Sequence, residues 1–470
     1  MSSTIATIVV LAAGLGTRMR SATPKVLHRV CGAPILSYVL QAAAALEPER
    51  LVVVLGHGHE AVRPILPEGC RVALQSEQRG TGDALLAAAE HVADGPLLVL
   101  AGDTPLVYAE VLRGLVEAHR AAGAAATVMT MRREDPTGYG RVIRDGQGYV
   151  ARIVEHRDAS AAEQAVHEVN TGMYVLPGRE ALEILRGVGT ANDQGEVYLT
   201  DVVEGLVRRG ARVAAHVTPD PAAALGVNSR AELAEAQAIM RERIARAWML
   251  AGVTIEDPQS THIDATVALE SDVTILPFTC LRGATRVGRG SEIGPAATLV
   301  DTVVGEDCRV RHAYAEGARL ERGASVGPFT YLRPEAHLLE KAKAGAFVEI
   351  KKSTVGRGSK VPHLSYIGDT TIGAGTNIGA GNITANYDGY RKHPTVIGDN
   401  VKTGSDTVFV APVQVGDGSV IGAGSVITKD VPAGALGIAR SRQKNILGWA
   451  GRRRAEEESE KDRGHGGTDD

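Results

Sequence analysis

The chain has 470 residues, a length that predicts two or three folded domains. Its 51 basic and 55 acidic residues give a formal net charge of −4, which argues against a general nucleic-acid-binding protein. Apolar residues make up 44% of the sequence, as in ordinary globular proteins, while aromatic residues are scarce at 4% and the 55 glycines favour a fold rich in tight turns.

The chain begins with an apolar segment, Thr4–Gly14, which no lysine or arginine precedes and which runs into glycines. A signal peptide is therefore not expected, and no apolar run reaches the roughly 18 residues that a transmembrane helix needs. The four cysteines show no CxxC spacing: Cys31, Cys70, Cys280 and Cys308. Their sparseness favours a reducing compartment, so we predict a cytoplasmic protein without membrane insertion.

Short apolar runs alternate with helical patterns over the first 228 residues. Four runs are predicted to be buried strands: Ile5–Ala12, Leu51–Leu55, Leu97–Leu100 and Ala125–Met131. Three helices are predicted between them: Pro34–Leu46, Asp83–Val92 and Ala109–Ala122. This alternation predicts an α/β, Rossmann-like domain over residues 1–228, with a mostly parallel sheet and helices on both faces.

Residues 229–250 contain neither glycine nor proline and place apolar residues at helical spacing. Ser229 is suited to cap the start of such a helix, and Glu232 three residues later would complete a capping box. We interpret this helix as a rigid linker between two domains. The alternative is an ordinary last helix of the first domain.

A period of six residues begins near residue 251. Its clearest stretch repeats one phase over five steps: Ile397, Thr403, Phe409, Val415, Ile421 and Ile427. Six residues match one flat face of a triangular coil, with the phased residue pointing inward. We therefore predict an all-β, left-handed parallel β-helix of hexapeptide repeats over residues 251–450. Coils of this kind associate through their flat faces, so we expect a homotrimer.

Two segments depart from the hexapeptide period. Thr384–Pro394 interrupts it with polar and aromatic residues, among them Asn386, Tyr387 and Lys392, and is predicted to be a functional loop. Residues 451–470 carry runs of arginine and glutamate with almost no apolar residues. This tail is predicted to be disordered.

A glycine-rich turn, GLGTRM, follows the first predicted strand, and PKVLH comes soon after it. Such a turn can offer backbone N–H groups to a phosphate. It is not a Walker A loop, because GxxxxGK[ST] is absent, and Met19 stands where a dinucleotide fingerprint needs its third glycine. Arg18 and Lys25 place positive charge near the turn, as the loss of pyrophosphate from a triphosphate requires. Two solvated surface cations are the alternative.

LAAGLGTRM followed by PKVLH resembles the signature of the nucleoside-diphosphate-sugar pyrophosphorylases. Further motifs match in order: Gln75 with Gly80-Thr81-Gly82, Ala101-Gly102-Asp103, Gly138-Tyr139-Gly140-Arg141, Ile153-Val154-Glu155, Asn170-Thr171-Gly172 and Gly226-Val227-Asn228. In the second domain, KVPHLSYIGD, NIGAGNITANYDG and GSDTVFVAP match an acetyltransferase segment. Over roughly residues 5–445, the chain resembles the family of bifunctional N-acetylglucosamine-1-phosphate uridyltransferases/glucosamine-1-phosphate N-acetyltransferases.

This resemblance implies that the enzyme makes UDP-N-acetylglucosamine in two steps. Acetyl passes from acetyl-CoA to glucosamine-1-phosphate, and uridylyl then passes from UTP to N-acetylglucosamine-1-phosphate with release of pyrophosphate. The product would feed cell-envelope precursors, namely peptidoglycan and lipopolysaccharide.

For uridylyl transfer, the resemblance implies that Arg18 and Lys25 act on the phosphates. The residues implied to bind the nucleotide are Leu11, Ala12, Ala13, Gly14, Lys25, Gln75, Gly80 and Thr81. Those implied to bind N-acetylglucosamine are Gly140, Glu155, Asn170 and Asn228. Gln75 carries the donor and acceptor that a uracil edge requires. Asp103 and Asn228 would coordinate Mg²⁺, which prefers oxygen ligands. Ala101 stands where the family often has an aromatic residue.

For acetyl transfer, the resemblance implies that His363 is the general base, because an imidazole can take the proton of an amine near neutral pH. Glu349 would orient it. The residues implied to bind glucosamine-1-phosphate are Arg333, Lys351, Tyr366, Asn377 and Lys392. Those implied to bind acetyl-CoA are Ala380, Asn386, Tyr387, Ser405, Ala423 and Arg440. Ala346 departs from the family, which usually has an asparagine there.

Three other functions compete with this reading. The first is a nucleotidyltransferase with a purely structural β-helix, against which His363 and Arg440 argue. The second is a metal hydratase that holds zinc between subunits, but the histidines of the coil lack paired spacing: His312, His337, His363 and His393. The third is an assembly scaffold with a dead catalytic domain, which would require the loss of Arg18, Lys25 or Asp103.

Overall fold

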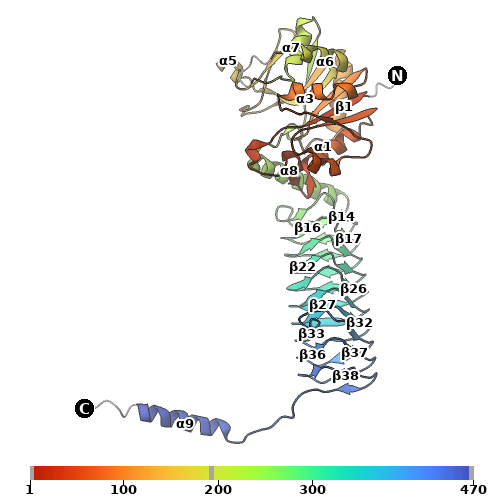
Figure 1. The fold of residues 1–470 in the computed structure, drawn as a ribbon, viewed down its shortest axis with the longest axis vertical. Coiled ribbons are helices and arrows are strands. Elements are labelled where there is room, and N and C mark those ends of the chain that lie inside the picture. The colour runs from red at the N-terminus through yellow and green to blue at the C-terminus, as the bar shows by residue number, and fades with distance from the viewer. Residues whose placement is uncertain (1–4, 190–194, 465–470) are drawn as a thin grey trace, which may run out of the picture. The chain divides into compact units, whose positions relative to one another are not determined.

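A computed structural model describes residues 5–189 and 195–464 (Figure 1). The chain forms two compact units, residues 1–303 and 304–470. The first unit holds an α/β domain, a long helix and the first hexapeptide coils, and the second holds the remaining coils and the C-terminal segment. Within the described residues, no helix combines the length and the apolar character needed to cross a membrane.

The α/β domain is built on one large sheet. Its strands are β1 Thr7–Ala12, β4 Arg50–Leu55, β5 Arg71–Leu74, β6 Pro96–Ala101, β7 Ala126–Arg132, β8 Arg141–Arg144, β9 Val150–Val154, β10 Glu168–Pro177 and β11 Val213–Val217. Seven follow the order β11-β7-β10-β6-β1-β4-β5, in which β10 runs antiparallel to both neighbours and the other pairs are parallel. The predicted, mostly parallel sheet is therefore confirmed.

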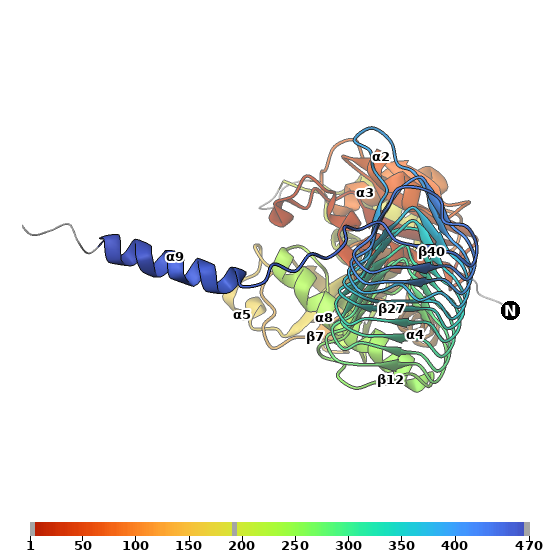
Figure 2. The same cartoon turned by 90° about the horizontal axis from the view of Figure 1, so that it is seen from below.

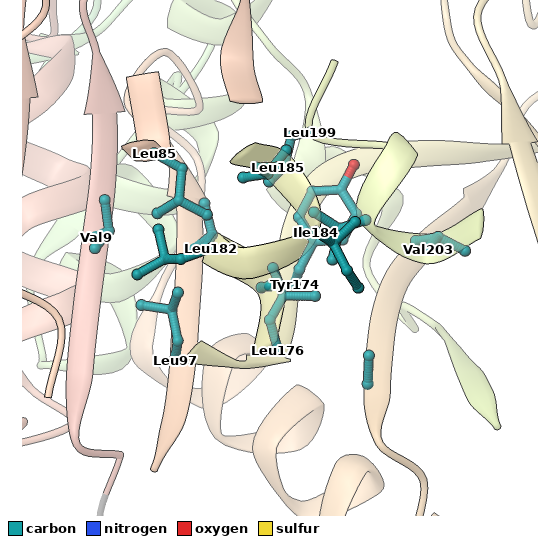
Figure 3. Packing of buried hydrophobic residues seen from close by; sticks show 14 of the residues in the cluster. Val9, Leu85, Leu97, Tyr174, Leu176, Leu182, Ile184, Leu185, Leu199 and Val203 are labelled. Carbon is teal, nitrogen blue, oxygen red and sulfur yellow. The ribbon is translucent and has the colours of Figure 1, made fainter. Parts of the chain in front are cut away.

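Helices cover both faces of this sheet. They are α1 Ile35–Ala44, α2 His59–Val62, α3 Thr81–Ala87, α4 Ala109–Ala122, α5 Ala161–Gln164, α6 Gly178–Arg186 and α7 Asp201–Arg208. Strand β1 shows why both faces must be covered: Val9 belongs to the cluster under α3 and α6, while Ile8 and Val10 belong to the cluster under α1 and α4. Figure 3 shows the first of these clusters. Side chains that alternate along a strand point to opposite faces, so this strand is apolar throughout.

Helix α8, Arg230–Leu250, begins after the Ser229 cap that the sequence indicates. The Ser229 hydroxyl accepts the Glu232 backbone N–H at 3.3 Å. The Glu232 carboxylate accepts the backbone N–H of Asn228 at 2.8 Å, one residue earlier than in a standard capping box. Apolar residues of α8, including Leu233 and Ala236, pack on the α/β domain. The helix therefore joins the hexapeptide coils while also completing the core of the first domain.

The coil has three faces of short parallel strands. In the first unit, face one has β12 Thr254–Ile255, β15 Thr274–Ile275 and β18 Glu292–Ile293; face two has β13 His262–Ile263, β16 Cys280–Arg282 and β19 Thr298–Val300; face three has β14 Ala268–Leu269 and β17 Arg286–Val287. Strand β20, Val303–Val304, spans the limit of the unit. Hydrogen bonds run between successive turns on each face, as a parallel β-helix requires.

The second unit repeats this arrangement. Face one has β21 Arg309–Val310, β24 Ser325–Val326, β27 Lys343–Ala346, β30 Lys360–His363, β35 Lys402–Thr403, β38 Val420–Ile421 and β40 Leu436–Gly437. Face two has β22 Ala313–Glu316, β25 Thr330–Leu332, β28 Glu349–Lys351, β31 Tyr366–Gly368, β33 Ile383–Ala385, β36 Val408–Val410 and β39 Val426–Ile427. Face three has β23 Arg319–Leu320, β26 Ala336–Leu338, β29 Ser353–Val355, β32 Thr370–Ile372, β34 Thr395–Ile397 and β37 Val413–Val415. Figure 2 shows this triangular winding along the coil.

The inward phase follows the predicted period. All six phased residues between 397 and 427 are buried, including Phe409 at 0% exposure. The phase shifts by one residue between Ile367 and Ile372, because that face is one residue shorter, and both side chains are nevertheless buried. The left-handed parallel β-helix of hexapeptide repeats is therefore confirmed.

The tail differs from its prediction. Helix α9, Trp449–Gly464, occupies most of the segment expected to be disordered, while residues 465–470 lie outside the described part of the chain. The segment is rich in arginine and glutamate, which favour helix. Arg453 forms an ion pair with Glu456 at 3.2 Å and lies over the Trp449 ring at 6.0 Å. A segment with too few apolar residues to form a packed core can therefore still form a helix.

Candidate active sites

A cavity of about 470 Å³ opens at the carboxyl ends of β1, β5 and β6 in the α/β domain. Eleven of the predicted residues line it: Leu11, Ala12, Ala13, Gly14, Lys25, Gln75, Gly80, Thr81, Asp103, Glu155 and Asn170. Arg18, Gly140 and Asn228 are not among the lining residues. The carboxyl ends of parallel strands meet at one edge of a sheet, and residues from distant motifs therefore converge there.

The glycine-rich turn wraps closely around Lys25. Gly16 has φ +63°, and a Cβ added there would lie 2.6 Å from the Cβ of Lys25. Only glycine fits both the left-handed conformation and this approach. Arg18 lies in the short 3₁₀ helix η1, Thr17–Met19, that follows, with its side chain exposed.

Lys25 lies between two of the predicted metal ligands. Its ammonium donates to a carboxylate oxygen of Asp103 and, at 3.0 Å, to the amide oxygen of Asn228. The Lys25 and Asp103 side chains are only 11% and 22% exposed. Gly226 lies beside both oxygen-bearing groups, because a Cβ added there would be 3.6 Å from the Asn228 amide nitrogen and 3.7 Å from an Asp103 oxygen. The predicted pair of residues therefore presents two oxygens to one cation.

The Gln75 amide is held by hydrogen bonds within the protein. Its Nε2 donates to the carbonyl of Gly80 at 3.1 Å and to the carboxylate of Asp83 at 2.8 Å. Both amide hydrogens are thus occupied, and the Oε1 acceptor is the part left for a ligand. The binding of a uracil edge by Gln75 stays a prediction. Gly80 has φ +106°, and a Cβ there would lie 2.5 Å from the Val197 carbonyl oxygen.

Three of the predicted sugar-binding residues, Gly140, Glu155 and Asn170, belong to the loops and strands around β8, β9 and β10, and two of them, Glu155 and Asn170, line the cavity. A Cβ on Gly140 would lie 3.5 Å from either carboxylate oxygen of Glu155. Thr200 donates its hydroxyl to Glu155 at 3.3 Å, and Asn170 donates to the hydroxyl of buried Tyr174 at 2.6 Å. Burial raises the pKa of Glu155, and the Thr200 bond offsets only part of that rise. Sequence reasoning missed Thr200 and Tyr174, because an isolated hydroxyl residue carries no motif.

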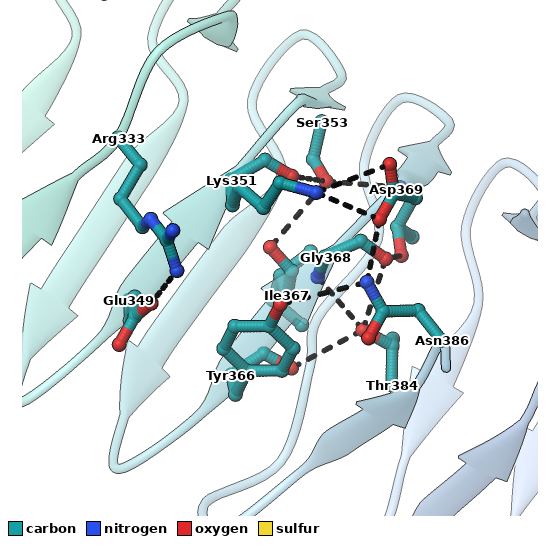
Figure 4. Close-up of polar contacts among 11 residues, drawn as sticks. Arg333, Glu349, Lys351, Ser353, Tyr366, Ile367, Gly368, Asp369, Thr384 and Asn386 are labelled. Atoms are coloured by element: carbon teal, nitrogen blue, oxygen red, sulfur yellow. Dashed lines mark hydrogen bonds and ion pairs between the residues drawn. The ribbon is translucent and has the colours of Figure 1, made fainter. Parts of the chain in front are cut away.

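A second polar cluster lies on face two of the coil (Figure 4). Lys351 forms an ion pair with Asp369 at 3.1 Å, and the amide of Asn386 donates to the same carboxylate at 2.5 Å. Gly368 leaves room for this contact, because a Cβ there would lie 2.5 Å from the Tyr366 hydroxyl. Burial opposes ionisation of Asp369, but the bonds from Lys351 and Asn386 outweigh it and lower its pKa. Asp369 was missed by motif reasoning, although SYIGD contains it.

The cluster carries an excess of positive charge. Arg333 pairs with Glu349 at 2.9 Å. Lys392 lies beside Lys351, and this like charge lowers the pKa of Lys392. Within the described residues, the carboxylate of Glu349 contacts Arg333 and makes no hydrogen bond to His363. Glu349 thus occupies a different role from the orienting one expected.

The other predicted residues of this site are spread over the coil. His363 ends β30 on face one, just before the corner at Leu364, and its side chain is exposed. Asn377 also lies on face one, where it pairs with Lys360 and Lys402. Face two, by contrast, carries Tyr366. A single chain therefore does not bring Asn377 to the Lys351 cluster.

Four of the six predicted acetyl-CoA residues form a column along one corner of the coil, while Asn386 and Tyr387 lie after β33, with Asn386 in the Lys351 cluster. The Ala380 carbonyl accepts the backbone N–H of Asp406 at 2.8 Å, and the Ser405 carbonyl accepts that of Gly424 at 2.8 Å. Successive turns thus stack Ala380, Ser405 and Ala423, and Arg440 follows, with its Cδ 3.9 Å from a Cβ built on Gly424. Small side chains in a column leave an open strip suited to an extended ligand.

Comparison with known proteins gives matches over both domains. Residues 8–249 match the family described as MobA-like NTP transferase domain, and residues 394–429 match that described as bacterial transferase hexapeptide (six repeats). Among solved structures, one of UDP-glucose pyrophosphorylase complexed with UDP-glucose covers 51% of this chain and 99% of its own at 18% identity, with a TM-score of 0.43.

Curated relatives match nearly the whole chain. A bifunctional protein GlmU of Streptomyces avermitilis is 51% identical over 456 residues, which are 96% of this chain and 95% of that protein. The one from Streptomyces coelicolor is 50% identical with the same coverage, and the one from Heliobacterium modesticaldum is 47% identical over 94% of this chain and 98% of its own. With this identity, and with an NTP transferase domain and hexapeptide repeats in one chain, the chain belongs to the family of bifunctional GlmU proteins, enzymes that unite a nucleotidyltransferase with an acetyltransferase in the synthesis of UDP-N-acetylglucosamine.

Proposed function

We propose that the cavity of the α/β domain transfers uridylyl from UTP to N-acetylglucosamine-1-phosphate. The observation that carries this proposal is that Lys25, which donates to Asp103 and Asn228, lines the same cavity as Glu155 and Asn170. The sugar phosphate oxygen attacks the α-phosphorus of UTP, and the bond to the β-phosphate breaks to release pyrophosphate. Lys25, and Arg18 at the mouth of the turn, stabilise the charge on the phosphates.

Mg²⁺ fits the oxygens of Asp103 and Asn228. Both already accept hydrogen bonds from the ammonium of Lys25, so they form a ready set of hard donors for a cation. Mg²⁺ is usually held by one or two carboxylates together with phosphates and water, so two protein oxygens suffice. When bound, the ion would neutralise phosphate charge.

We propose that face two of the coil transfers acetyl to glucosamine-1-phosphate. Arg333, Lys351 and Lys392 bind the sugar phosphate, because guanidinium and ammonium groups pair with phosphate oxygens. His363 takes a proton from the amine of glucosamine-1-phosphate as the amine nitrogen attacks the thioester carbonyl of acetyl-CoA. The bond from the carbonyl carbon to sulfur then breaks, and the coenzyme leaves as a thiolate that receives a proton. The coenzyme lies along the column of Ala380, Ser405, Ala423 and Arg440, with Asn386 and Tyr387 beside it. Tyr366 and Asn377 complete the sugar site.

We propose a homotrimer assembled through the coils. A row of exposed side chains with positive φ lies along one corner of the second unit: His312, Phe329, Phe347 and Leu364. Phe329 stacks on Phe347 with ring centroids 5.2 Å apart, and the two are 59% and 58% exposed. Exposed apolar side chains that lie next to one another favour an interface with another chain. The row ends beside His363, so a neighbouring chain would exclude water from the base and supply Asn377.

The trimer has its own test. Phe329→Ser with Phe347→Ser should reduce the mass measured by sedimentation from that of three chains to that of one. Acetyl transfer should fall with it, while uridylyl transfer should persist. A double variant that remains trimeric would contradict the assignment of this row to the interface.

The proposed activities fit one compartment. None of the four cysteines forms a disulfide, as is typical of proteins in a reducing compartment. One assay tests the two transfers together: the full chain is incubated with glucosamine-1-phosphate, acetyl-CoA, UTP and Mg²⁺, and free thiol, pyrophosphate and UDP-N-acetylglucosamine are measured. All three products are expected. Thiol without pyrophosphate would remove the uridylyl site. Because uridylyl transfer needs the acetylated sugar phosphate, a second arm supplies N-acetylglucosamine-1-phosphate with UTP and Mg²⁺, and pyrophosphate in that arm without thiol in the first would remove the acetyl site.

A further inference from the structure

A second cavity lies inside the first compact unit, and none of its lining residues belongs to the candidate active sites. Its volume is about 640 Å³. Three elements line it: the hairpin of β2 Arg29–Val30 and β3 Ala33–Pro34, helix α8, and the first coils of the β-helix. The backbone N–H of Ala265 donates to the carbonyl of Cys31 at 2.9 Å and fixes the hairpin against the coil. The cavity therefore lies where the hairpin, helix α8 and the first coils of the β-helix meet.

Arginines dominate the charge of this cavity. Arg29, Arg241 and Arg282 line it, and Asp264 is the one carboxylate among its lining residues. Within residues 5–189 and 195–461, none of the three guanidinium groups forms an ion pair with a carboxylate. Arg243, two residues along α8 from Arg241, shows the contrast, because it pairs with Asp220 at 2.8 Å. The excess of cations is local, since the whole chain has a net charge of −4.

The polar neighbours of these arginines are already engaged. The Asp264 carboxylate accepts the backbone N–H of Gly283 at 3.1 Å, and its Cγ would lie 2.5 Å from a Cβ on Gly32. Arg241 lies 3.1 Å from the Nε2 of His262. Burial lowers the pKa of His262, and Arg241 lowers it further, which disfavours a competing positive charge on the imidazole. Arg29 donates one N–H to the carbonyl of Gly32 at 2.5 Å, and most of the other guanidinium N–H groups are left for a ligand.

We propose that this cavity binds a small anion that carries phosphate. Guanidinium groups match phosphate oxygens in paired hydrogen bonds, and three of them suit a dianion better than a single carboxylate. The volume lies in the range of small-molecule sites. The hairpin continues directly from the helix turn that holds Lys25, and α8 begins two residues after Asn228. An anion held by hairpin, helix and coil would therefore stabilise the segments that place both residues.

Equilibrium dialysis of labelled phosphate against the full chain tests the site. Saturating UDP-N-acetylglucosamine fills the uridylyl pocket, and every chain compared carries Lys351→Gln/Lys392→Gln, so that phosphate bound in that pocket or at the lysines of the coil does not contribute. Inorganic phosphate, pyrophosphate and glycerol phosphate form separate arms, which distinguish an inorganic anion from a phosphate monoester. We expect saturable binding in at least one arm, with affinity at least about tenfold weaker in Arg241→Gln/Arg282→Gln, because two charge-assisted contacts are lost.

The control is Arg246→Gln/Arg289→Gln, which removes the same charge from α8 and the coil outside the cavity and should bind as the unaltered chain does. If the first variant fails to fold, Arg241→Lys/Arg282→Lys keeps the charge but loses the paired geometry, and should bind several-fold more weakly. Absence of binding in every arm, or equal binding by the cavity variants and the unaltered chain, would overturn the proposal. An equal loss in the control would overturn it too, because the effect would be one of net charge alone.

Discussion

Each candidate active site holds one lysine, one aspartate and one asparagine in contact: Lys25, Asp103 and Asn228 in the cavity, and Lys351, Asp369 and Asn386 on the coil. The direction of the hydrogen bonds differs. Asn228 turns its oxygen to the lysine, so two oxygens meet one cation. Asn386 turns its nitrogen to the aspartate, so one carboxylate receives two donors.

The direction of these hydrogen bonds indicates which kind of ion each group of three residues is suited to bind. Two oxygens around a cation form a site in which a metal ion can replace the ammonium. A carboxylate that is already satisfied by Lys351 and Asn386 holds the lysine in place but offers little to a metal. With Arg333 and Lys392 nearby, the coil retains positive charge for a phosphate. The same three residue types therefore indicate a cation site in one domain and an anion site in the other.

Cutting the chain between its two domains should separate the two transfer activities completely. A fragment of residues 1–251 keeps α8 and should retain uridylyl transfer, measured as pyrophosphate release, while thiol release from acetyl-CoA is abolished. A fragment of residues 1–228 should be much less stable, because it exposes the apolar surface that Leu233 and Ala236 cover. Thermal unfolding compares the two. Equal stability would mean that α8 is only a linker.

His363→Ala should lower acetyl transfer by about 10²–10⁴-fold, because the amine loses its general base. Uridylyl transfer and the affinity for acetyl-CoA should stay unchanged. A variant that keeps more than a tenth of the normal turnover, or that loses only coenzyme affinity, would contradict the role of a base.

Asp103→Asn tests the cation site of the cavity. The variant keeps the shape of the side chain but loses the charge that would hold Mg²⁺, so uridylyl transfer should fall about 10²–10³-fold. The Mg²⁺ concentration needed for half-maximal rate should rise as well, while acetyl transfer acts as the internal control. A normal Mg²⁺ dependence would remove Asp103 from the metal site.

Asp369→Asn is the matched change on the coil, and its effect should be smaller. Lys351 loses its anchor, so the KM for glucosamine-1-phosphate should rise about tenfold with little change in kcat, and no metal dependence should appear. The pKa of Asp369 is lowered in the folded protein, so its ion pair stabilises the fold above about pH 4 and is lost as pH falls further. The difference in thermal stability between variant and parent should therefore vanish in acid.

The sequence predicts the fold well because its signals are periodic. The six-residue phase placed Phe409 and Ile421 inside the coil, and the apolar alternation placed β1 between two layers. Pairing of side chains was not predicted, because it depends on which residues stack on successive turns. Lys351 and Asp369 are 18 residues apart, and Arg333 and Glu349 are 16 apart. Only the register of the coil shows that such residues are neighbours.

The loop at residues 384–394 gives the enzyme a place where its length is free to change. Ala385 and Thr395 are ten residues apart, whereas their strand partners Val410 and Val413 are three apart. Seven extra residues thus leave the coil and return to it without altering the register of any strand. Insertions and deletions here would leave the fold of the coil intact. They would change substrate binding, because the loop carries Asn386, Tyr387 and Lys392. The loop can therefore change substrate specificity during evolution without lowering the stability of the coil.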